Sequence, residues 1–111
     1  DALSDQQIQA LDDYLARSLA QRPTLTAAGR ASGVSPRRLG AALKAATGFS
    51  FSDYLAEFRV RNARMLLEGS NLPLKEISHR SGFSHVSSFT TAFRRAVGMT
   101  PGQYRARGRQ L

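Results

Sequence analysis

Two segments of the chain, about fifty residues apart, place arginine, serine and threonine side chains near the start of a predicted helix. Residues 32–48 read SGVSPRRLGAALKAATG and residues 81–98 read SGFSHVSSFTTAFRRAVG. Arginine offers a planar fork of donors that matches phosphate and guanine edges, whereas serine and threonine offer single hydrogen bonds and small apolar contacts. A doubled pattern of these residue types points to recognition of nucleic acid.

The charge of the chain supports the same interpretation. The 111 residues include 16 Lys or Arg and 8 Asp or Glu, so the formal net charge is +8, and every basic residue except Lys44 and Lys75 is arginine. Residues 77–111 contain no acidic residue. Such a chain favours anionic partners, and charge alone is compatible with DNA, with RNA and with a membrane surface.

The sequence argues against an enzyme, a metal site and a cofactor site. There is no cysteine, which excludes disulfide bonds and thiolate ligands or nucleophiles. It has no His-Glu-x-x-His motif, no glycine-rich phosphate loop and no Ser-His-Asp set. The two histidines, His79 and His85, lie in different predicted elements and lack the i, i+4 spacing of a helical metal site. We therefore expect neither catalysis, nor a cofactor, nor a bound metal.

A membrane-spanning or exported protein is not expected either. No segment approaches the roughly 18 consecutive apolar residues of a transmembrane helix, and no N-terminal stretch has the composition of a signal peptide. Together with the absence of cysteine, these features favour the cytoplasm. The length fits a single small domain, or two very small ones that share a connecting element.

The elements that must position the two segments are all predicted to be helices, so the fold class is all-α. A capping box at Ser4-x-x-Gln7 begins a helix that ends at Arg22-Pro23. The first helix-turn-helix unit covers about residues 22–48, with a short helix capped by Thr24, a turn at Gly33, and a second helix that begins at Ser35-Pro36. We expect Ala31 in the short helix, and Leu39, Leu43 and Ala46 in the second, to face the core.

A linker helix over about residues 52–68 precedes a second unit over about residues 72–105. Leu74 to Ser81 form its first helix, Gly82 its turn, and His85 to Val97 its second helix, which we expect to be capped by Ser84. Its expected inward residues are Phe89, Ala92, Phe93 and Ala96. A capping box at Thr100-Pro101-x-Gln103 begins a last short helix that runs through Tyr104, and residues 105–111 are expected to fray.

The two units are copies of one plan. Leu25 and Ala28 match Leu74 and Ile77, and Leu39, Leu43 and Gly48 match Phe89, Phe93 and Gly98. An internal repeat of this kind fixes the architecture as seven helices in which two helix-turn-helix units flank a linker helix.

This order of motifs resembles the DNA-binding domain of the AraC/XylS family of bacterial transcription regulators. The segment EISHRSGFSHVSSFTTAFRRAVGMTPGQYR, residues 76–105, is similar to the recurring C-terminal stretch of the family, and YLAEFRVRNARMLLEG, residues 54–69, looks like its linker helix. The resemblance covers about residues 22–105.

The resemblance implies sequence-specific binding of double-stranded promoter DNA, with the second helix of each unit in successive segments of the major groove. It also implies activation by contact with RNA polymerase, and an N-terminal effector-sensing or dimerising domain outside this chain. The alternatives are the DNA-targeting module of a multidomain enzyme, and a module that binds nucleic acid without sequence preference.

By analogy with the family, base contacts come from the N-terminal half of each recognition helix. The predicted base-contacting residues are Arg37, Arg38, Ala41, Val86, Ser87, Thr90 and Thr91. Arg37 is suited to guanine, whereas Val86, Thr90 and Thr91 are suited to thymine methyls and single hydrogen bonds. The predicted phosphate contacts are Thr24 and Lys75 at helix starts and Lys44, Arg94 and Arg95 further along the recognition helices.

Other side chains are expected to serve the fold. The apolar residues Phe83, Phe89, Phe93, Leu39 and Leu43 should form the core. Arg59 on the linker helix should be structural, Arg61 and Arg64 should form a solvated face, and Arg105, Arg107 and Arg109 should supply non-specific charge. Because Gly40 and Ala41 stand where many family members carry longer polar side chains, the second unit should hold more sequence information than the first.

Overall fold

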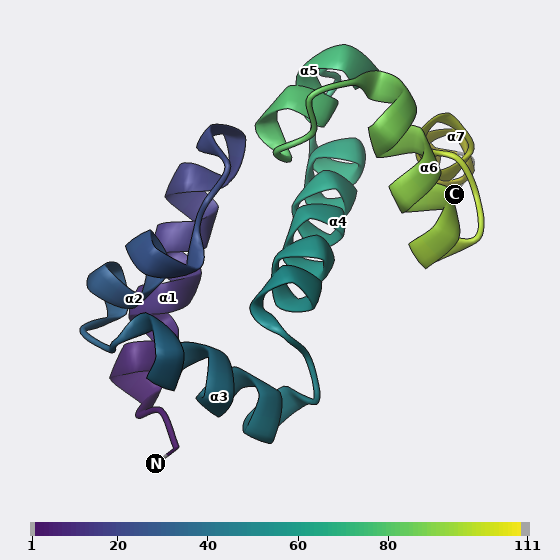
Figure 1. Cartoon of the computed structure of the whole chain (residues 1–111). Coiled ribbons are helices and arrows are strands. Elements are labelled where there is room, and N and C mark those ends of the chain that lie inside the picture. Colours follow the sequence, from purple (N-terminus) through teal and green to yellow (C-terminus); the bar gives the residue numbers. More distant parts are fainter. Residues whose placement is uncertain (1, 110–111) are drawn as a thin grey trace. The chain divides into compact units, whose positions relative to one another are not determined.

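The computed structural model of the chain describes residues 2–109, which form helices and turns without a strand (Figure 1). The α-helices of this part are α1 (Asp5–Ser18), α2 (Leu25–Ser32), α3 (Pro36–Thr47), α4 (Phe51–Gly69), α5 (Leu74–Arg80), α6 (Val86–Val97) and α7 (Pro101–Arg109), with a short 3₁₀ helix, η1 (Leu19–Gln21), after α1. The predicted all-α class with seven helices is confirmed. The chain divides into two compact units, and the boundary lies inside α4, between Phe58 and Arg59.

The first unit begins at the predicted capping box. Ser4 Oγ accepts a hydrogen bond from the backbone N–H of Gln7 at 3.1 Å, and the Gln7 side chain accepts one from the backbone N–H of Ser4 at 2.9 Å. These bonds satisfy amides that a helix start would otherwise leave open. Tyr54, on the first turn of α4, donates its hydroxyl to Asp12 of α1 at 2.7 Å, which attaches the start of α4 to this unit.

The turn between α2 and α3 depends on two glycines. Gly33 ends α2 with a φ of 73°, a left-handed conformation that residues with a side chain rarely adopt. A Cβ at Gly29 would lie 2.6 Å from the backbone oxygen of Val34, so only glycine lets the two helices approach this closely. Ser35 then caps α3 by accepting from the N–H of Arg38 at 3.2 Å, and Pro36 occupies the first helical position.

The inner face of the first unit differs from the prediction at two alanines. The buried cluster is made by Leu11, Leu15, Leu19, Ala28, Val34, Leu39, Leu43 and Leu55. Ala46 of α3 was expected to face the core but is exposed. Ala42, one turn earlier in the same helix, is buried instead. Ala31 is also exposed, because α2 turns Ala28, Gly29 and Ser32 toward its neighbours.

An aromatic row holds the second unit together. The buried cluster is made by Ala63, Leu67, Ile77, Phe89 and Phe93. The ring centroids of Phe83 and Phe89 lie 5.4 Å apart, those of Phe89 and Phe93 5.8 Å, and those of Phe93 and Tyr104 5.5 Å. The expected core role of the phenylalanines is confirmed, whereas Ala96 is exposed and Ala92 is only half-buried.

The start of α6 also differs from the prediction. His85, not Ser84, is the N-cap residue, and no side chain caps this helix. The backbone of His85 is extended, and its carbonyl accepts from the N–H of Phe89 at 3.1 Å. Gly82 makes the preceding turn with a φ of 91°.

The last helix is longer than predicted. α7 begins at the expected capping box, where the Thr100 and Gln103 side chains bond each other's backbone amides, but it continues past Tyr104 to Arg109. Arg105 explains the extension, because its guanidinium donates to the backbone carbonyls of Leu67 at 3.5 Å and Ser70 at 3.3 Å. The fraying expected from residue 105 onward is wrong as far as Arg109, and residues 110–111 lie outside the described part.

Within the described part of the chain, no helix has the length and apolar character that crossing a membrane requires.

Candidate nucleic-acid interface

The outer face of α3 carries the arginines predicted to contact bases. Arg37, Arg38 and Ala41 are all exposed, and they border a shallow hollow continued by Ala45 and Ala46. Among the described residues, neither guanidinium has a hydrogen-bond partner. Apart from the arginines and Lys44, the exposed residues of this face include the alanines Ala41, Ala45 and Ala46, so most of it after the first turn is built from methyl groups.

The outer face of α6 has a different chemistry. Ser87 and Thr91 are exposed, Val86 is 39% exposed on the first turn of the helix, and Thr90 is half-buried. A valine left in solvent at a helix start offers a methyl-sized apolar contact beside hydroxyl groups. The predicted base-contacting residues of α6 therefore lie together on its N-terminal half, with Thr90 the least accessible of them.

Two of the predicted phosphate contacts are already engaged within the fold. Thr24 Oγ accepts from the N–H of Ala27 at 3.1 Å and thereby caps α2. Lys44 donates its ammonium to the carbonyl of Gly48 at 3.0 Å, at the C-terminal end of α3. Both side chains are exposed at their helix ends, so these bonds orient Thr24 and Lys44 without burying them.

The other three predicted phosphate contacts, Lys75, Arg94 and Arg95, are exposed and make no side-chain hydrogen bond with the described residues. Lys75 lies on the first turn of α5, and the two arginines lie near the C-terminal end of α6. The second unit thus presents positive charge on the first turn of α5 and near the C-terminal end of α6.

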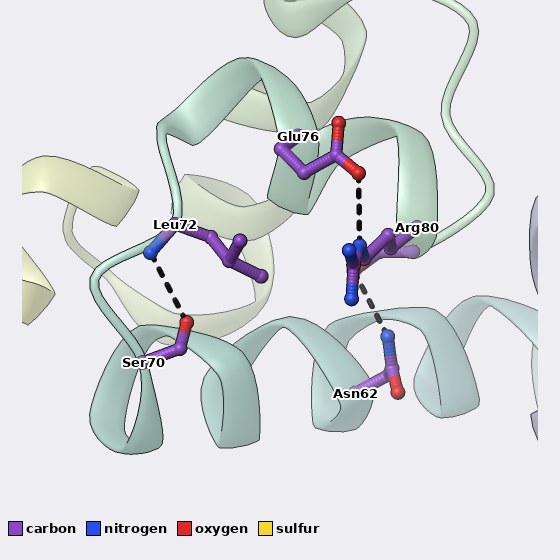
Figure 2. Close-up of polar contacts among 6 residues, drawn as sticks. Asn62, Ser70, Leu72, Glu76 and Arg80 are labelled. Carbon is purple, nitrogen blue, oxygen red and sulfur yellow. Dashed lines mark hydrogen bonds and ion pairs between the residues drawn. The ribbon is translucent and has the colours of Figure 1, made fainter.

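Polar contacts fix α5 against α4 in the second unit (Figure 2). Asn62 of α4 donates its side-chain amide to Ser81 Oγ at 3.2 Å, and Ser81 is fully buried at the end of α5. On α5, Arg80 Nε donates to Glu76 at 2.9 Å, which holds the pKa of that carboxyl below its ordinary value. The first helix of this helix-turn-helix unit therefore has a defined position on its support.

Several arginines outside the recognition helices prove to be structural. The guanidinium carbon of Arg59 lies 5.8 Å from the ring centroid of Phe83, in agreement with the expected structural role. Arg64 was expected on a solvated face; it is exposed, but its guanidinium lies over the ring of Tyr104 at 5.8 Å. Sequence periodicity does not detect such contacts, because the partner rings lie far along the chain.

The C-terminal arginines also correct the prediction of non-specific charge. Arg105 donates to the carbonyls of Leu67 in α4 and of Ser70 just after it, and Arg109 donates to Ser70 at 3.4 Å and to the Asn71 side chain. Tyr104 donates its hydroxyl to Glu68, and this bond raises the pKa of the tyrosine. These contacts fasten α7 to the end of α4 and to the loop that leads into α5.

Comparison with known proteins agrees with this geometry. The model of a helix-turn-helix domain family matches residues 28–107. The chain is 43% identical over 82 residues to the HTH-type transcriptional regulator GlxA of Rhizobium meliloti (strain 1021), an alignment that covers 74% of this chain and 25% of that protein. It is 36% identical over 104 residues to an AraC-like transcription regulator of Streptomyces antibioticus, covering 93% and 34% of the two chains.

The chain belongs to the AraC-type helix-turn-helix family. The DNA-binding domain of the transcriptional factor AdpA, solved in complex with a target DNA, superimposes with a TM-score of 0.80 at 26% identity over 96% of both chains. This AraC-type chain is thus a helix-turn-helix DNA-binding domain of a family of transcription regulators. It spans about a quarter to a third of the length of the two relatives.

Proposed function

We propose that this AraC-type domain directs a bacterial transcription regulator to a promoter by inserting α3 and α6 into successive segments of the major groove of double-stranded DNA. The observation that carries the proposal is the contrast between the two faces of each recognition helix. The inner residues Leu39 and Phe89 are fully buried, while the polar and basic residues of the outer faces are exposed. A helix that offers unpaired donors on one side of a rigid core is suited to groove binding.

Each predicted residue has a role that follows from its chemistry. The unpartnered fork of Arg37 is suited to a bidentate pair with guanine O6 and N7, worth about 1–3 kcal/mol of discrimination, and Arg38 stands beside it. Val86 and Thr90 provide apolar contact for thymine, and Ser87 and Thr91 provide single hydrogen bonds. Thr24, Lys44, Lys75, Arg94 and Arg95 contact phosphates and set the register of the domain.

We further propose that α6 contributes more to sequence preference than α3. A Cβ at Gly40 would meet only Leu25 Cδ2, at 3.7 Å, so no packing constraint requires glycine there. Packing therefore does not explain the missing side chain at Gly40, and the exposed residues Ala41 and Ala45 beside it carry only methyl groups. A helix surface made of glycine and alanine can fit closely against DNA, but it forms few base-specific hydrogen bonds.

The same proposal includes the intact regulator to which this domain would belong. By family resemblance, it works in the cytoplasm, activates transcription by contact with RNA polymerase, and carries an effector-sensing or dimerising domain outside this chain. The domain itself performs no catalysis in this scheme.

Selection of bound duplexes from a random DNA library tests the proposed function. We expect one asymmetric motif with two conserved segments separated by about one helical turn, or 10–10.5 base pairs. Measured against a scrambled duplex of the same composition, the selected duplex should bind at least a thousand-fold more tightly, the lower end of the usual specificity range. Equal affinity for both duplexes, or preference for single-stranded RNA, would refute the proposal and favour a non-specific nucleic-acid module.

A further inference from the structure

A hollow on the second unit lies between α5 and the start of α6, next to the predicted base-contacting residues. Lys75, His79, His85 and Ser84 form part of its wall, and Val86 and Ser87 continue the wall onto α6. The side chains of Lys75, His79 and His85 are all exposed. The only two histidines of the chain therefore open onto one concave surface together with a lysine.

The two histidines are held on this surface by their backbones. Ser78, which is 2% exposed, donates its hydroxyl to the carbonyl of His85 at 3.4 Å and accepts at its own carbonyl from the N–H of Phe83 at 3.0 Å. The carbonyl of His79 accepts from the N–H of Gly82 at 3.0 Å. His85 is the N-cap residue of α6, but its side chain makes no hydrogen bond with the backbone amides of the helix. Capping therefore does not engage its imidazole.

The charged groups around the hollow favour an anion. Glu76 also lines it, but this carboxylate is paired with Arg80 at 2.9 Å, and the pKa of Glu76 is lowered first by that hydrogen bond and also by the charge of His79. From α4, the guanidinium of Arg59 lies over Phe83, a further wall residue. The nearest charged residue along α6 is Arg94, two turns away. Cationic groups thus outnumber the single, paired carboxylate.

We propose that this hollow binds one phosphate of the DNA backbone, with Lys75 as a permanent cation and His79 and His85 as cations that depend on pH. The inference rests on the proposed DNA-binding function and adds the two histidines to it. An imidazolium donates N–H groups to phosphate oxygens, whereas a neutral imidazole contributes no charge. Because Val86 and Ser87 line the same hollow, the phosphate is one that flanks the bases contacted by α6.

The consequence is a DNA affinity that rises as the pH falls. An imidazolium binds the phosphate and a neutral imidazole does not, so the gain in affinity is complete at low pH and is lost as the pH rises. Each ionic contact contributes about 0.9 to the slope of log K against log salt. Between 1 M and 0.1 M salt, this slope corresponds to roughly an eight-fold additional gain in affinity for each protonated histidine.

The test measures the affinity of the selected duplex between pH 5.5 and 8.5 at fixed ionic strength. We expect the unmodified chain to bind more tightly at pH 5.5, with a steeper salt dependence than at pH 8.5. His79→Gln and His85→Gln should each remove part of the effect, and the double variant should bind with one affinity throughout. Arg95→Gln, which removes an exposed arginine assigned to a phosphate, should lower the affinity at every pH and keep the pH dependence.

Replacement of single phosphates by neutral methylphosphonates identifies the anion. One position next to the segment contacted by α6 should abolish the pH dependence of the unmodified chain, and the same position should have a smaller effect in the double variant. Helix content measured by circular dichroism at pH 5.5 and 8.5 verifies that all variants are folded.

The outcomes separate this inference from the proposed function. A pH-independent affinity of the unmodified chain for its selected duplex would overturn the histidine site alone. An undiminished pH effect in the double variant would also overturn it, because another group would then be responsible. If selection yields no preferred duplex at any pH, the proposed function itself fails.

Discussion

At the scale of single residues, we expect the exposed side chain of Val86 to set a preference for one base. It is 39% exposed at the first position of α6, so part of its isopropyl group faces solvent. Neighbouring hydroxyl groups form hydrogen bonds with many base edges, but an isopropyl group gains free energy only from another apolar group. In the major groove, the thymine methyl is the apolar group that the bases offer.

Replacement of thymine by uracil in the selected duplex tests this role. Loss of a buried methyl costs about 0.8 kcal/mol, or about a four-fold lower affinity. We expect this loss at one position of the segment contacted by α6, and we expect Val86→Ala to bind the thymine and uracil duplexes about equally. A uracil effect of the same size in Val86→Ala would assign the methyl contact to another residue.

The ranking of the two recognition helices is a second prediction at this scale. Arg37→Ala should cost about 1–3 kcal/mol of discrimination at one guanine position, while Ser87→Ala combined with Thr91→Ala should relax preference over several positions. Repeating the library selection with each variant measures both effects. If the double variant selected the original motif while Arg37→Ala selected none, α3 would be the dominant helix.

At the scale of elements, α2 and α3 contain two helical glycines with opposite reasons to be there. A Cβ at Gly29 would collide with the backbone oxygen of Val34 at 2.6 Å, whereas a Cβ at Gly40 would make an ordinary contact with Leu25 at 3.7 Å. Alanine is favoured over glycine inside a helix by up to about 1 kcal/mol. The steric cost outweighs this preference at the first position and not at the second.

We therefore expect Gly29→Ala to destabilise the domain by about 1–3 kcal/mol, as overpacking does, and Gly40→Ala to stabilise it by up to about 1 kcal/mol. Urea unfolding followed by circular dichroism measures both. An increase in the free energy of unfolding for Gly29→Ala would show that the backbone at Val34 can shift away from the added Cβ at little cost.

The contact between α7 and α4 gives a matched pair of arginine substitutions. Arg105 donates to the carbonyls of Leu67 in the last turn of α4 and of Ser70 just after it, whereas Arg107 is exposed and makes no hydrogen bond with the described residues. A cation at a helix C-terminus contributes about 0.3–1 kcal/mol. Arg105→Gln should lower the free energy of unfolding by about that amount and Arg107→Gln should leave it unchanged; equal effects would mean that net charge, not the cap, matters.

The helix starts and turns were predictable because their signals are local. The Ser4 capping box, the Ser35-Pro36 start and the turns at Gly33 and Gly82 each depend on residues within one helical turn of each other. The bases that the outer residues contact are still predictions.

The missed features depend on partners that are distant along the chain. Ala46 and Ala96 are exposed because an alanine buries too little surface to decide which way a helix faces. The length of α7 depends on the carbonyls of α4, and Gly102 and Gly108 weaken any local signal for that helix. Likewise, the pairing of Arg64 with Tyr104 requires the folded second unit.

At the scale of the whole molecule, the cationic groups predict how affinity depends on salt. Lys44, Lys75, Arg94 and Arg95 are four cations assigned to phosphates, and at about 0.9 each they give a slope of about −3.6 for log K against log salt at pH 8.5. Measurement between 50 and 200 mM salt, taken as a typical range, tests this value. A slope near zero would mean that phosphates contribute little, and Arg95→Gln should make the slope shallower by about 0.9.

The unlike outer faces of α3 and α6 have one more consequence. Since the inner residues of the two helices match while the outer ones do not, we expect the bound duplex to lack the two-fold axis of a palindromic operator and the two ends of the bound domain to differ. Reversing its site within a promoter would turn the protein around, so that a neighbour on the same DNA would meet the opposite end. The sequence of the DNA site would then determine the direction in which the domain is bound as well as its position.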